Sequence, residues 1–530
     1  MSRVIVIGAG VAGLATAGLL ARDGHEVTVL EKNAVVGGRA GSLHRHGFRF
    51  DTGPSWLLLP EAFEHFFALM GTSSDEQLDL RSLDPGYAVF AERHEGAPVS
   101  PVAVHARGAA PILFERLEPG AGRRLTAYLS SARRAKDLAL AHFLYNPYTR
   151  LSGLFRPEVL RVLPRLAGLL STSLDAFASR RFAHPVLRQI LGYPAVFLGT
   201  DPRRAPALYH LLSALDLDDG VRYPQGGFAR VIDRLTALAE DAGAVIVTDA
   251  EVEEILTTTT TTGAEVRGVR WRDGTGVERR LSADIVVSAA DLHHTETRLL
   301  PPRLRTWPER WWRRRVSGPG AVTVMLGIRG RLPRLPHHSL FLAEDWHANL
   351  DAVFGTRPRV PEPASLYACK PSQTDPTVAP EGDENLFLLV PVPPDVALGR
   401  GGSEGGGDRR VEEIADAAID TVSQWAGIPD LRPRILVRET RGPADFAADF
   451  HSWRGGMLGP AHVLSQSAVL RARNASRRVR GLYFAGATTS PGVGVPMCLI
   501  SAELVLKRIR GDRSAGPLPE PAGADVRRRG

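Results

Sequence analysis

Cysteine is nearly absent from this sequence, which contains only Cys369 and Cys498 among 530 residues. Two distant cysteines do not provide a disulfide framework or the ligand spacing of a zinc site. We therefore predict no bound metal, and the low cysteine content suits a reducing cytoplasm. The sequence also lacks a nucleophile elbow and an HExxH motif. These absences argue against the hydrolases and metalloproteases that depend on such motifs.

Long apolar runs are scarce as well. Residues 4–21 form the one uncharged stretch that is long enough to suggest a membrane span. It begins with the β-branched residues 4–7, and three glycines then interrupt it before a stretch rich in leucine and alanine. This pattern predicts a strand, a tight turn and a helix instead of a span or a signal peptide. Any membrane association is therefore expected to be peripheral.

Acidic residues are outnumbered by basic ones, 58 to 65, which gives a formal net charge of +7. Part of the excess is local, because residues 303–315 contain six arginines and three tryptophans. Such a cluster suits an anionic membrane surface or a nucleic acid. A solvated helix face with the tryptophans packed underneath explains the cluster equally simply. We expect no nucleic-acid partner and leave the other two interpretations open.

The chain is longer than the roughly 250–300 residues that one hydrophobic core supports, so we expect two or more domains. Leucine, alanine and arginine dominate residues 115–215, which predicts helices, including one over 158–170 that Pro164 interrupts. We expect a hairpin loop at the six threonines 257–262 and a disordered tail at 511–530. Short β-branched stretches predict strands at 245–247, 251–255, 266–271 and 285–287.

The first dense motif is Gly8-Ala-Gly-Val-Ala-Gly13, which lies between the predicted strand and the predicted helix. Gly8 permits a tight turn, Gly10 lets the backbone approach a pyrophosphate, and Gly13 lets strand and helix pack closely. The helix N-terminus at Ala12 adds free amide groups and a partial positive charge. A glycine-rich turn alone is common, but in this context it predicts dinucleotide binding.

The residues that follow indicate which dinucleotide is bound. The second strand ends at Glu31, followed by Lys32, and an acidic side chain at this point suits ribose hydroxyls. Gly37, Gly38 and Arg39 come soon afterwards and offer a second backbone approach and a guanidinium for bidentate phosphate contact. A simple nicotinamide domain needs no such clamp. The sequence therefore predicts FAD.

A second dense motif lies near the C-terminus. Residues 482–485 predict a strand, and Gly486 follows where the chain must turn. A stiff Gly/Pro loop then spans 491–496, and a helix follows from Cys498 onward. Strand, loop and helix at both ends of the chain predict one cofactor domain assembled from separated segments, with helix amides facing the electron-rich edge of the flavin.

These motifs carry a family resemblance. The spacing from Gly8 through Glu31 to Arg39 resembles the flavoprotein superfamily of amine oxidases, protoporphyrinogen oxidases and carotenoid desaturases. Residues 481–496 are closely similar to the signature of bacterial-type phytoene desaturases. Further family-like stretches are 51–56, 215–228, 283–291, 458–462 and 466–467. The resemblance implies an FAD site formed by Gly8, Gly10, Ala12, Gly13, Glu31, Lys32, Gly38 and Arg39, with Val252 at the adenine and Ser55, Gly486, Val495, Pro496 and Met497 near the isoalloxazine.

The resemblance also implies an α/β fold. A Rossmann-like FAD-binding domain assembled from discontinuous segments would be joined by a mixed substrate domain and a helical subdomain. We assign residues 115–219 to the helical subdomain, on the substrate and membrane side. The FAD-binding domain is expected at 1–60, 220–300 and 475–510, and the substrate-binding domain at 61–114 and 301–474.

The implied function is desaturation of an apolar polyene such as phytoene, in peripheral contact with the inner face of the cell membrane. Hydride transfer to a flavin needs placement in a dry slot and no catalytic signature. Leucine-rich residues 115–215 and the aromatic stretch 56–69 suit an apolar wall, although ordinary core packing explains them too. With one dinucleotide motif, we expect oxygen or a membrane quinone as electron acceptor. No proton acceptor stands out among His210, Asp218, Asp219, Asp291 and His293.

Two residues depart from the family signature, namely Thr488 and Ser490. Both fall where the resemblance puts the flavin, so the polyene substrate and the number of desaturation steps stay open. A polyene isomerase or saturase, an amine oxidase, and a flavin-binding protein without enzymatic activity are the alternatives.

Overall fold

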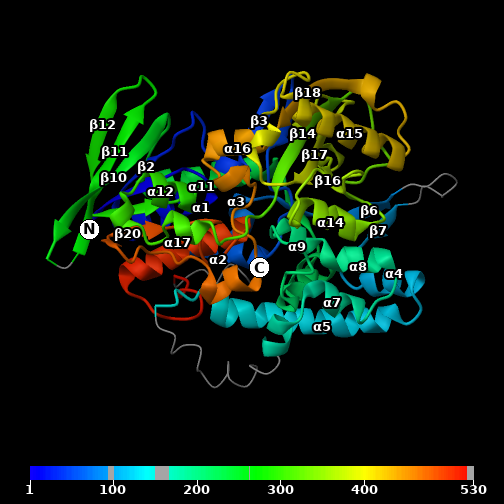
Figure 1. Cartoon of the computed structure of the whole chain (residues 1–530), viewed down its shortest axis with the longest axis horizontal. Helices are drawn as coiled ribbons and strands as arrows, with labels where there is room; N and C mark the ends of the chain where they lie inside the picture. Colours follow the sequence, from blue (N-terminus) through cyan, green and yellow to red (C-terminus); the bar gives the residue numbers. More distant parts are fainter. Residues whose placement is uncertain (93–100, 150–165, 262, 522–530) are drawn as a thin grey trace.

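A computed structural model describes residues 1–92, 101–149, 166–261 and 263–521 of the chain. Figure 1 shows two sheets and several helices on the left, another sheet at the upper right and a group of helices at the lower right. Segments from both ends of the chain meet in the left-hand part.

Five parallel strands form one of the two sheets in the left-hand part, in the order β20-β13-β1-β2-β9. The central strand β1 pairs with β13 on one side and β2 on the other. A strand buried on both faces favours a continuous β-branched run, and residues 4–7 form such a run. The arrangement confirms the predicted Rossmann-like fold assembled from discontinuous segments. The strands are β1 (Arg3–Ile7), β2 (Glu26–Leu30), β9 (Val245–Val247), β13 (Ile285–Ser288) and β20 (Leu482–Phe484).

Helix α1 (Val11–Arg22) packs against both α11 (Gly227–Asp241) and α17 (Val495–Arg510). The start of α11 is fixed by Asp51, whose carboxylate accepts hydrogen bonds from the backbone N–H of Phe228 at 2.7 Å and of Ala229 at 3.2 Å. A carboxylate at a helix N-terminus satisfies free amides and favours the helix dipole. Two family-like stretches of the sequence, 51–56 and 215–228, therefore meet at this cap.

A smaller antiparallel sheet consists of β10 (Ala250–Thr260), β11 (Gly263–Asp273) and β12 (Glu278–Ser282), and β19 (Val479–Arg480) pairs with β11. The predicted loop at the threonines is wrong for residues 257–260, because Thr257 to Thr260 pair with Val266 to Gly263. β-branched threonine favours an extended, pleated backbone. The hairpin is therefore longer than the sequence suggested, and Thr262 lies outside the described residues.

The upper-right sheet has the strand order β18-β14-β17-β16-β15-β6-β7. Helix α15 (Arg409–Trp425) packs against β14, β15, β17 and β18, and α16 (Pro443–Phe450) packs against β14. The strands are β6 (Tyr87–Ala91), β7 (Val102–Val104), β14 (Gly320–Ile328), β15 (His338–Leu342), β16 (Leu366–Cys369), β17 (Glu384–Val392) and β18 (Ile435–Arg441).

The lower-right part is helical, as the composition of residues 115–215 predicts. It contains α4 (Ala110–Leu117), α5 (Ala121–Ala139), α7 (Leu174–Ser179), α8 (Pro185–Gly192), α9 (Pro194–Phe197) and α10 (Leu212–Ala214). Single π-helical turns follow at Leu140–Leu144 and Leu215–Asp219. Residues 166–171 are helical, whereas the rest of the helix predicted over 158–170 lies outside the described residues.

The remaining short elements connect these parts. The pairs β3 with β4 and β5 with β8 are antiparallel. The elements are β3 (Ser42–Arg45), β4 (Phe48–Asp51), β5 (Leu80–Ser82), β8 (Arg222–Pro224), α2 (Pro60–Leu69), α3 (Ser74–Gln77), α12 (Leu292–Arg298), α13 (Glu309–Trp312) and α14 (Trp346–Phe354).

The segment after α17 is held against the protein. The Lys507 ammonium group donates to the carbonyls of Ser514 at 2.8 Å and Gly516 at 2.7 Å. The Leu518 N–H donates to Glu503 at 2.7 Å, and the Leu518 side chain is buried. The prediction of a disordered tail is therefore wrong for residues 512–521, because buried polar groups of α17 bind the backbone of this segment. Residues 522–530 lie outside the described residues.

Candidate functional site

The N-terminal glycine motif forms a tight turn between β1 and α1. Gly8 has a φ of 94° and donates its N–H to the Leu30 carbonyl at 2.8 Å. A Cβ at Gly13 would lie 1.8 Å from the Gly8 carbonyl oxygen, so only glycine permits this approach of helix and turn. A Cβ at Gly10 would meet no heavy atom closer than 3.9 Å. The backbone at Gly10 therefore faces open space, as a turn that receives a phosphate requires.

Glu31 stands beside this turn at the end of β2. Its carboxylate accepts the backbone N–H of Ala9 at 2.7 Å and of Asn33 at 2.9 Å. These bonds hold the buried carboxylate between the glycine turn and the next loop. It occupies the position in which a ribose-binding acid is expected.

Arg39 adds a cation opposite the turn. Its guanidinium donates to the Ser452 hydroxyl and lies 3.9 Å from the Asp291 carboxylate, while the buried Nε has no hydrogen-bond partner. Burial lowers the pKa of Arg39. An unpaired buried N–H is costly and calls for a missing acceptor. The open glycine backbone and this unpaired donor both fit an anionic dinucleotide.

The C-terminal motif folds as the sequence predicts, with a helix start slightly earlier than expected. Strand β20 leads into Gly486, whose φ is 107° and whose N–H donates to Ser501 at 2.9 Å. Helix α17 begins at Val495, three residues before the predicted start, because Pro496 fits the first turn of a helix. Its free N-terminal amides lie beside the Gly/Pro loop.

One cavity of about 630 Å³ unites the two motifs. The predicted site residues that line it are Gly8, Gly10, Ala12, Glu31, Lys32, Gly38, Arg39, Ser55, Val252, Gly486, Val495, Pro496 and Met497. Gly13 does not line the cavity, because its role is the close contact with Gly8. The structure thus brings together residues from both ends of the chain and from β10.

A second region of the same cavity is apolar. Its lining comes from the helical part, from the π-helical turns and from the loops near α16, and includes Leu140, Phe143, Leu144, Phe197, Leu208, Leu211, Leu212, Phe446, Met457 and Leu458. We call this region the apolar arm. Of the aromatic stretch 56–69, Trp56, Leu58 and Leu59 line the cavity, whereas Phe63, Phe66 and Phe67 belong to the core under α1.

A hydrogen-bonded aromatic group stands where the arm meets the predicted flavin-binding loops. The Ser55 hydroxyl lies 2.5 Å from the Tyr367 hydroxyl, and Trp56 donates to the same oxygen at 3.1 Å. Tyr367 also bonds His338 Nδ1 at 2.8 Å. Sequence inspection could find Ser55 from its motif, but Tyr367 and His338 lie on strands that carry no recognisable motif.

The polar residues considered at the sequence level have structural partners. His210 bonds Ser131 and the Ala207 carbonyl, Asp218 pairs with Arg133, and Asp219 pairs with Lys136. Asp291 caps α12, and His293 pairs with Glu309. The two departures from the family signature also take local roles: Thr488 accepts the Leu292 N–H, and Ser490 donates to the Ala472 carbonyl.

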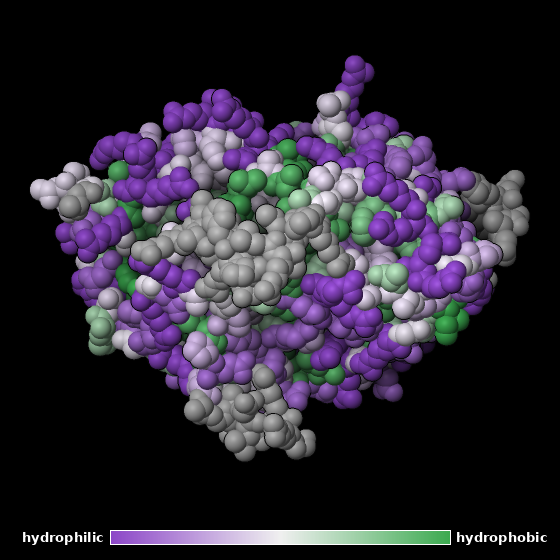
Figure 2. All heavy atoms as spheres, turned by 90° about the horizontal axis from the view of Figure 1, so that it is seen from below, coloured by the Kyte–Doolittle hydropathy of each residue, from purple (hydrophilic) through white to green (hydrophobic). Residues whose placement is uncertain are grey.

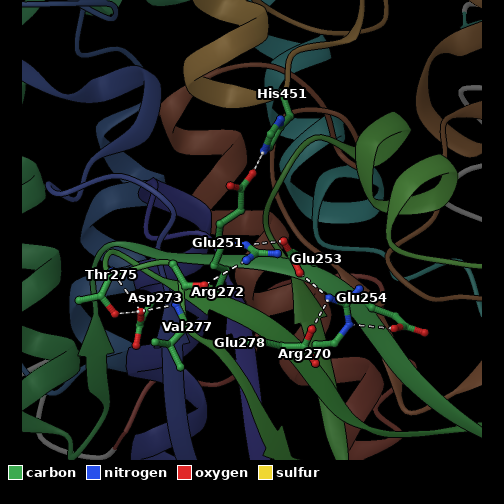
Figure 3. A network of polar contacts seen from close by, with 11 residues as sticks. Glu251, Glu253, Glu254, Arg270, Arg272, Asp273, Thr275, Val277, Glu278 and His451 are labelled. Atoms are coloured by element: carbon green, nitrogen blue, oxygen red, sulfur yellow. Dashed lines mark hydrogen bonds and ion pairs between the residues drawn. The ribbon is translucent and has the colours of Figure 1, made fainter.

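Two histidines that the sequence did not single out lie at the nucleotide end of the cavity. His294, from α12, stacks on His451, which follows α16. His451 Nε2 lies 3.1 Å from Glu251 of β10, and Figure 3 shows this contact above the Arg/Glu network of the small sheet. Burial, together with the neighbouring His451, lowers the pKa of His294 to about 3. The stack thus joins the small sheet to a segment near α16.

The basic cluster at 303–315 keeps its tryptophans inside. Trp307 and Trp312 are buried, and Trp311 is half-buried. This confirms the interpretation of tryptophans packed under a charged face. Beside Trp311, Val469 and Leu470 line a small hollow with Arg473 and Arg477. Figure 2 shows hydrophobic side chains only as scattered patches on the face seen from below. None of the helices within the described residues has the length and apolar character needed to cross a membrane.

Fold and site together define a flavin-dependent oxidoreductase. The open glycine turn, Glu31 beside it and the buried Arg39 fit an anionic dinucleotide, and an apolar chamber continues from them. The chain belongs to the flavin containing amine oxidoreductase family, whose model matches residues 11–509. FAD is the cofactor of this class.

Several relatives match along nearly their whole length. A carotenoid 3,4-desaturase of Haloarcula japonica is 39% identical over 504 residues, which cover 94% of this chain and 96% of that protein. A zeta-carotene-forming phytoene desaturase of Myxococcus xanthus is 35% identical and covers 96% of this chain and 93% of its own length. A 4,4'-diapophytoene desaturase of Staphylococcus aureus is 27% identical, with 97% and 100% covered.

Solved structures share the fold at lower identity. An oxidoreductase from Methanosarcina mazei superposes with a TM-score of 0.60 at 18% identity, over 95% of this chain and 100% of its own. Putrescine oxidase bound to putrescine gives a TM-score of 0.57 at 14% identity, with 96% and 99% covered. These similarities establish the fold.

Proposed function

We propose that this protein is an FAD-dependent carotenoid desaturase that acts on phytoene or a related polyene. The observation that carries the proposal is the whole-length similarity to curated carotenoid desaturases, at 39% identity for the Haloarcula japonica protein. The apolar arm supports it, since a long hydrocarbon needs an apolar chamber continuous with the flavin site. Amine oxidases share the fold at much lower identity.

In this proposal the nucleotide half of FAD is held by the glycine turn, with Glu31 at the ribose and Arg39 at the pyrophosphate. The amides at the start of α17 would face the isoalloxazine, together with the loops at Ser55 and Gly486. FAD accepts a hydride from an adjacent C–H bond when it is bound. The protein orients the polyene in the apolar arm so that the reacting carbon lies next to the flavin site, and it excludes water from that site.

We further propose a cytoplasmic location with peripheral contact at the inner face of the membrane, and oxygen or a membrane quinone as electron acceptor. The segment 464–470 supports the membrane contact: Ala468 lines the main cavity, whereas Leu464 and Leu470 are exposed large hydrophobic residues. Neighbouring arginines suit anionic lipid head groups. An apolar substrate could thus pass from lipid to the arm near this segment.

The test is expression in cells that accumulate colourless phytoene. Each desaturation lengthens the conjugated system, so the extract should absorb at longer wavelength and the cells should turn yellow to red. Chromatography would count the steps, and no NAD(P) should be consumed in stoichiometric amounts. The matched control is Gly10→Val, which should leave the cells colourless. Unchanged phytoene beside soluble, FAD-loaded protein would remove phytoene as the substrate, and failure with every polyene tested would favour the amine-oxidase alternative.

A further inference from the structure

The apolar arm contains one carboxyl group that the sequence did not single out. Asp216 lies on the π-helical turn Leu215–Asp219 and lines the cavity, yet its side chain is almost fully buried, with 4% of the residue exposed. The other carboxylates along the described lining are Glu31, Glu251, Asp291 and Asp449. Of these, Glu31, Glu251 and Asp291 are engaged by the nucleotide-side contacts described above, and Asp449 pairs with Arg441 at 3.4 Å. Asp216 is therefore set apart in a hydrocarbon-like environment.

Two phenols hold Asp216 in place. Tyr193 donates to Oδ2 at 2.9 Å, and Tyr87 donates to the same oxygen at 3.2 Å. Oδ1 is buried and accepts no hydrogen bond from another side chain among the described residues. Because an unsatisfied buried acceptor is costly, a group of this kind is usually retained for a purpose. The free oxygen makes Asp216 an available acceptor.

The Asp216 site is close to the aromatic group at the predicted flavin side. The indole of Trp56 packs on the ring of Tyr87 at 5.2 Å and on that of Tyr193 at 5.9 Å between centroids. Trp56 follows Ser55, which is expected at the isoalloxazine. A single layer of aromatic rings thus links the carboxyl group to the loop next to the reacting centre.

Burial raises the pKa of Asp216 to about 7, and the hydrogen bonds from Tyr193, from Tyr87 and from the backbone N–H groups of Asp216 and Leu217 oppose the rise. The tyrosines around it, including Tyr128 of α5, have raised pKa values and stay neutral. A base works best when its pKa lies near the working pH. Asp216 is thus available as a carboxylate at neutral pH and is basic enough to take up a proton.

Two basic side chains of the described cavity lining, Lys136 and His462, are committed elsewhere, and Lys136 pairs with Glu61 and Asp219. His462 lines the cavity, but its Nδ1 lies 2.8 Å from the Tyr209 hydroxyl and its Nε2 accepts the Val493 N–H at 3.3 Å. Burial also holds the pKa of His462 well below its ordinary value. Both nitrogens are therefore engaged, Nε2 with the Gly/Pro loop and Nδ1 with Tyr209, which leaves Asp216 as the better acceptor.

We propose that Asp216 is the proton acceptor of the desaturation, a catalytic role that rests on the proposed function. A hydride, with its electron pair, leaves one carbon of the substrate for the flavin, and a proton leaves the adjacent carbon for Asp216. The electrons of that second C–H bond form the new C=C bond. The external acceptor, oxygen or a quinone, then takes the two electrons from the flavin and receives two protons, one of which Asp216 returns. The balance is –CH2–CH2– plus acceptor to –CH=CH– plus reduced acceptor.

The test measures flavin reduction under anaerobic conditions in the FAD-loaded protein, with phytoene in detergent or liposomes. Asp216→Asn removes the base and keeps the size and the hydrogen bonding of the side chain. It should slow flavin bleaching about 10²- to 10⁴-fold, the usual contribution of a positioned base. FAD content and thermal unfolding should stay near wild type. The matched control is Asp218→Asn, two residues away, where an ion pair with Arg133 is lost and the rate should not change.

The pH profile separates a catalytic role from a structural one. The wild-type reduction rate should fall as the pH drops below about 7, because a protonated carboxyl cannot accept a proton. Asp216→Glu should restore part of the rate and retain an acidic limb, which Asp216→Asn should lose. A wild-type rate in Asp216→Asn would overturn the proposal, as would a change in substrate KM alone. If Asp216→Asn fails to fold, the wild-type and Asp216→Glu profiles decide the matter, and the absence of an acidic limb in both refutes it. Failure of wild type to reduce its flavin with any polyene would instead refute the proposed function.

Discussion

The imidazole rings of His294 and His451 are stacked, with centroids 3.8 Å apart and an angle of 2° between their planes. Two rings in this contact cannot both carry a positive charge without strong repulsion. Burial is the largest influence on the pKa of each histidine and lowers it. Lys32 also lowers both pKa values, whereas Glu251 raises that of His451. The stack is therefore a neutral contact at the nucleotide end of the cavity.

From the stack we predict that the apoprotein loses stability in acid. Below about pH 6.5, the ordinary pKa of histidine, the folded state binds fewer protons than the unfolded chain. The stabilisation is thus complete above that pH and is lost as the pH falls toward the lowered pKa of His294, about 3. Urea unfolding at pH 7.5 and 5.5 should show a larger loss in wild type than in His294→Gln. His451→Asn suits the φ of 50° and should behave similarly. Equal acid sensitivity of all three proteins would contradict this account.

Substitutions at Gly10 and at Gly13 are predicted to have different effects on the protein. A side chain at Gly10 has room in the protein itself, so Gly10→Val should fold but should lose FAD, since its branched side chain occupies the space of the pyrophosphate. Gly13→Ala forces a Cβ to within 1.8 Å of the Gly8 oxygen, and overpacking of this kind typically costs about 1–3 kcal/mol or more. Flavin absorbance and thermal unfolding of both variants check the prediction. A fully flavinated Gly10→Val would exclude the proposed pyrophosphate contact.

Membrane contact should have a salt-sensitive and a salt-insensitive component. Each arginine near an anionic surface contributes about 1 kcal/mol, whereas apolar insertion is not screened. Wild type should float with anionic liposomes, less so as salt rises. Leu464→Ser with Leu470→Ser should reduce the fraction that persists at high salt. Ile112→Ser, which removes an exposed hydrophobic residue of α4, is the matched control and should have no effect. Protein that never floats would eliminate the proposed contact.

The elements that the sequence predicted best are those fixed by local chemistry. β1, the glycine turn and α1 follow from a β-branched run, three glycines and an alanine-rich stretch, and all three form as expected. The motif around Gly486 was equally informative, because the Gly/Pro loop leaves the backbone few alternatives. The threonines were misjudged because a polar run resembles a loop, although their β-branched side chains suit a strand.

The parts that escaped prediction depend on contacts between distant segments. Asp216 gains its character from Tyr87 on β6 and Tyr193 near α8, and nothing in its own neighbourhood marks it apart from Asp218 and Asp219. The His294–His451 contact joins residues more than a hundred positions apart in the chain. The packed segment after α17 was missed for a similar reason, since composition alone does not reveal that Lys507 binds its carbonyls.

The strand order β20-β13-β1-β2-β9 has a consequence for biosynthesis. β1 and the glycine turn are synthesised first. β13 can pair with β20, and α1 can pack against α17, only after residues 482–510 have been synthesised. Until then a growing chain exposes an unpaired strand edge and the apolar side of α1, both of which promote aggregation. In the proposed site the flavin would therefore be captured only late, and cellular chaperones should engage this protein until its last strand is in place.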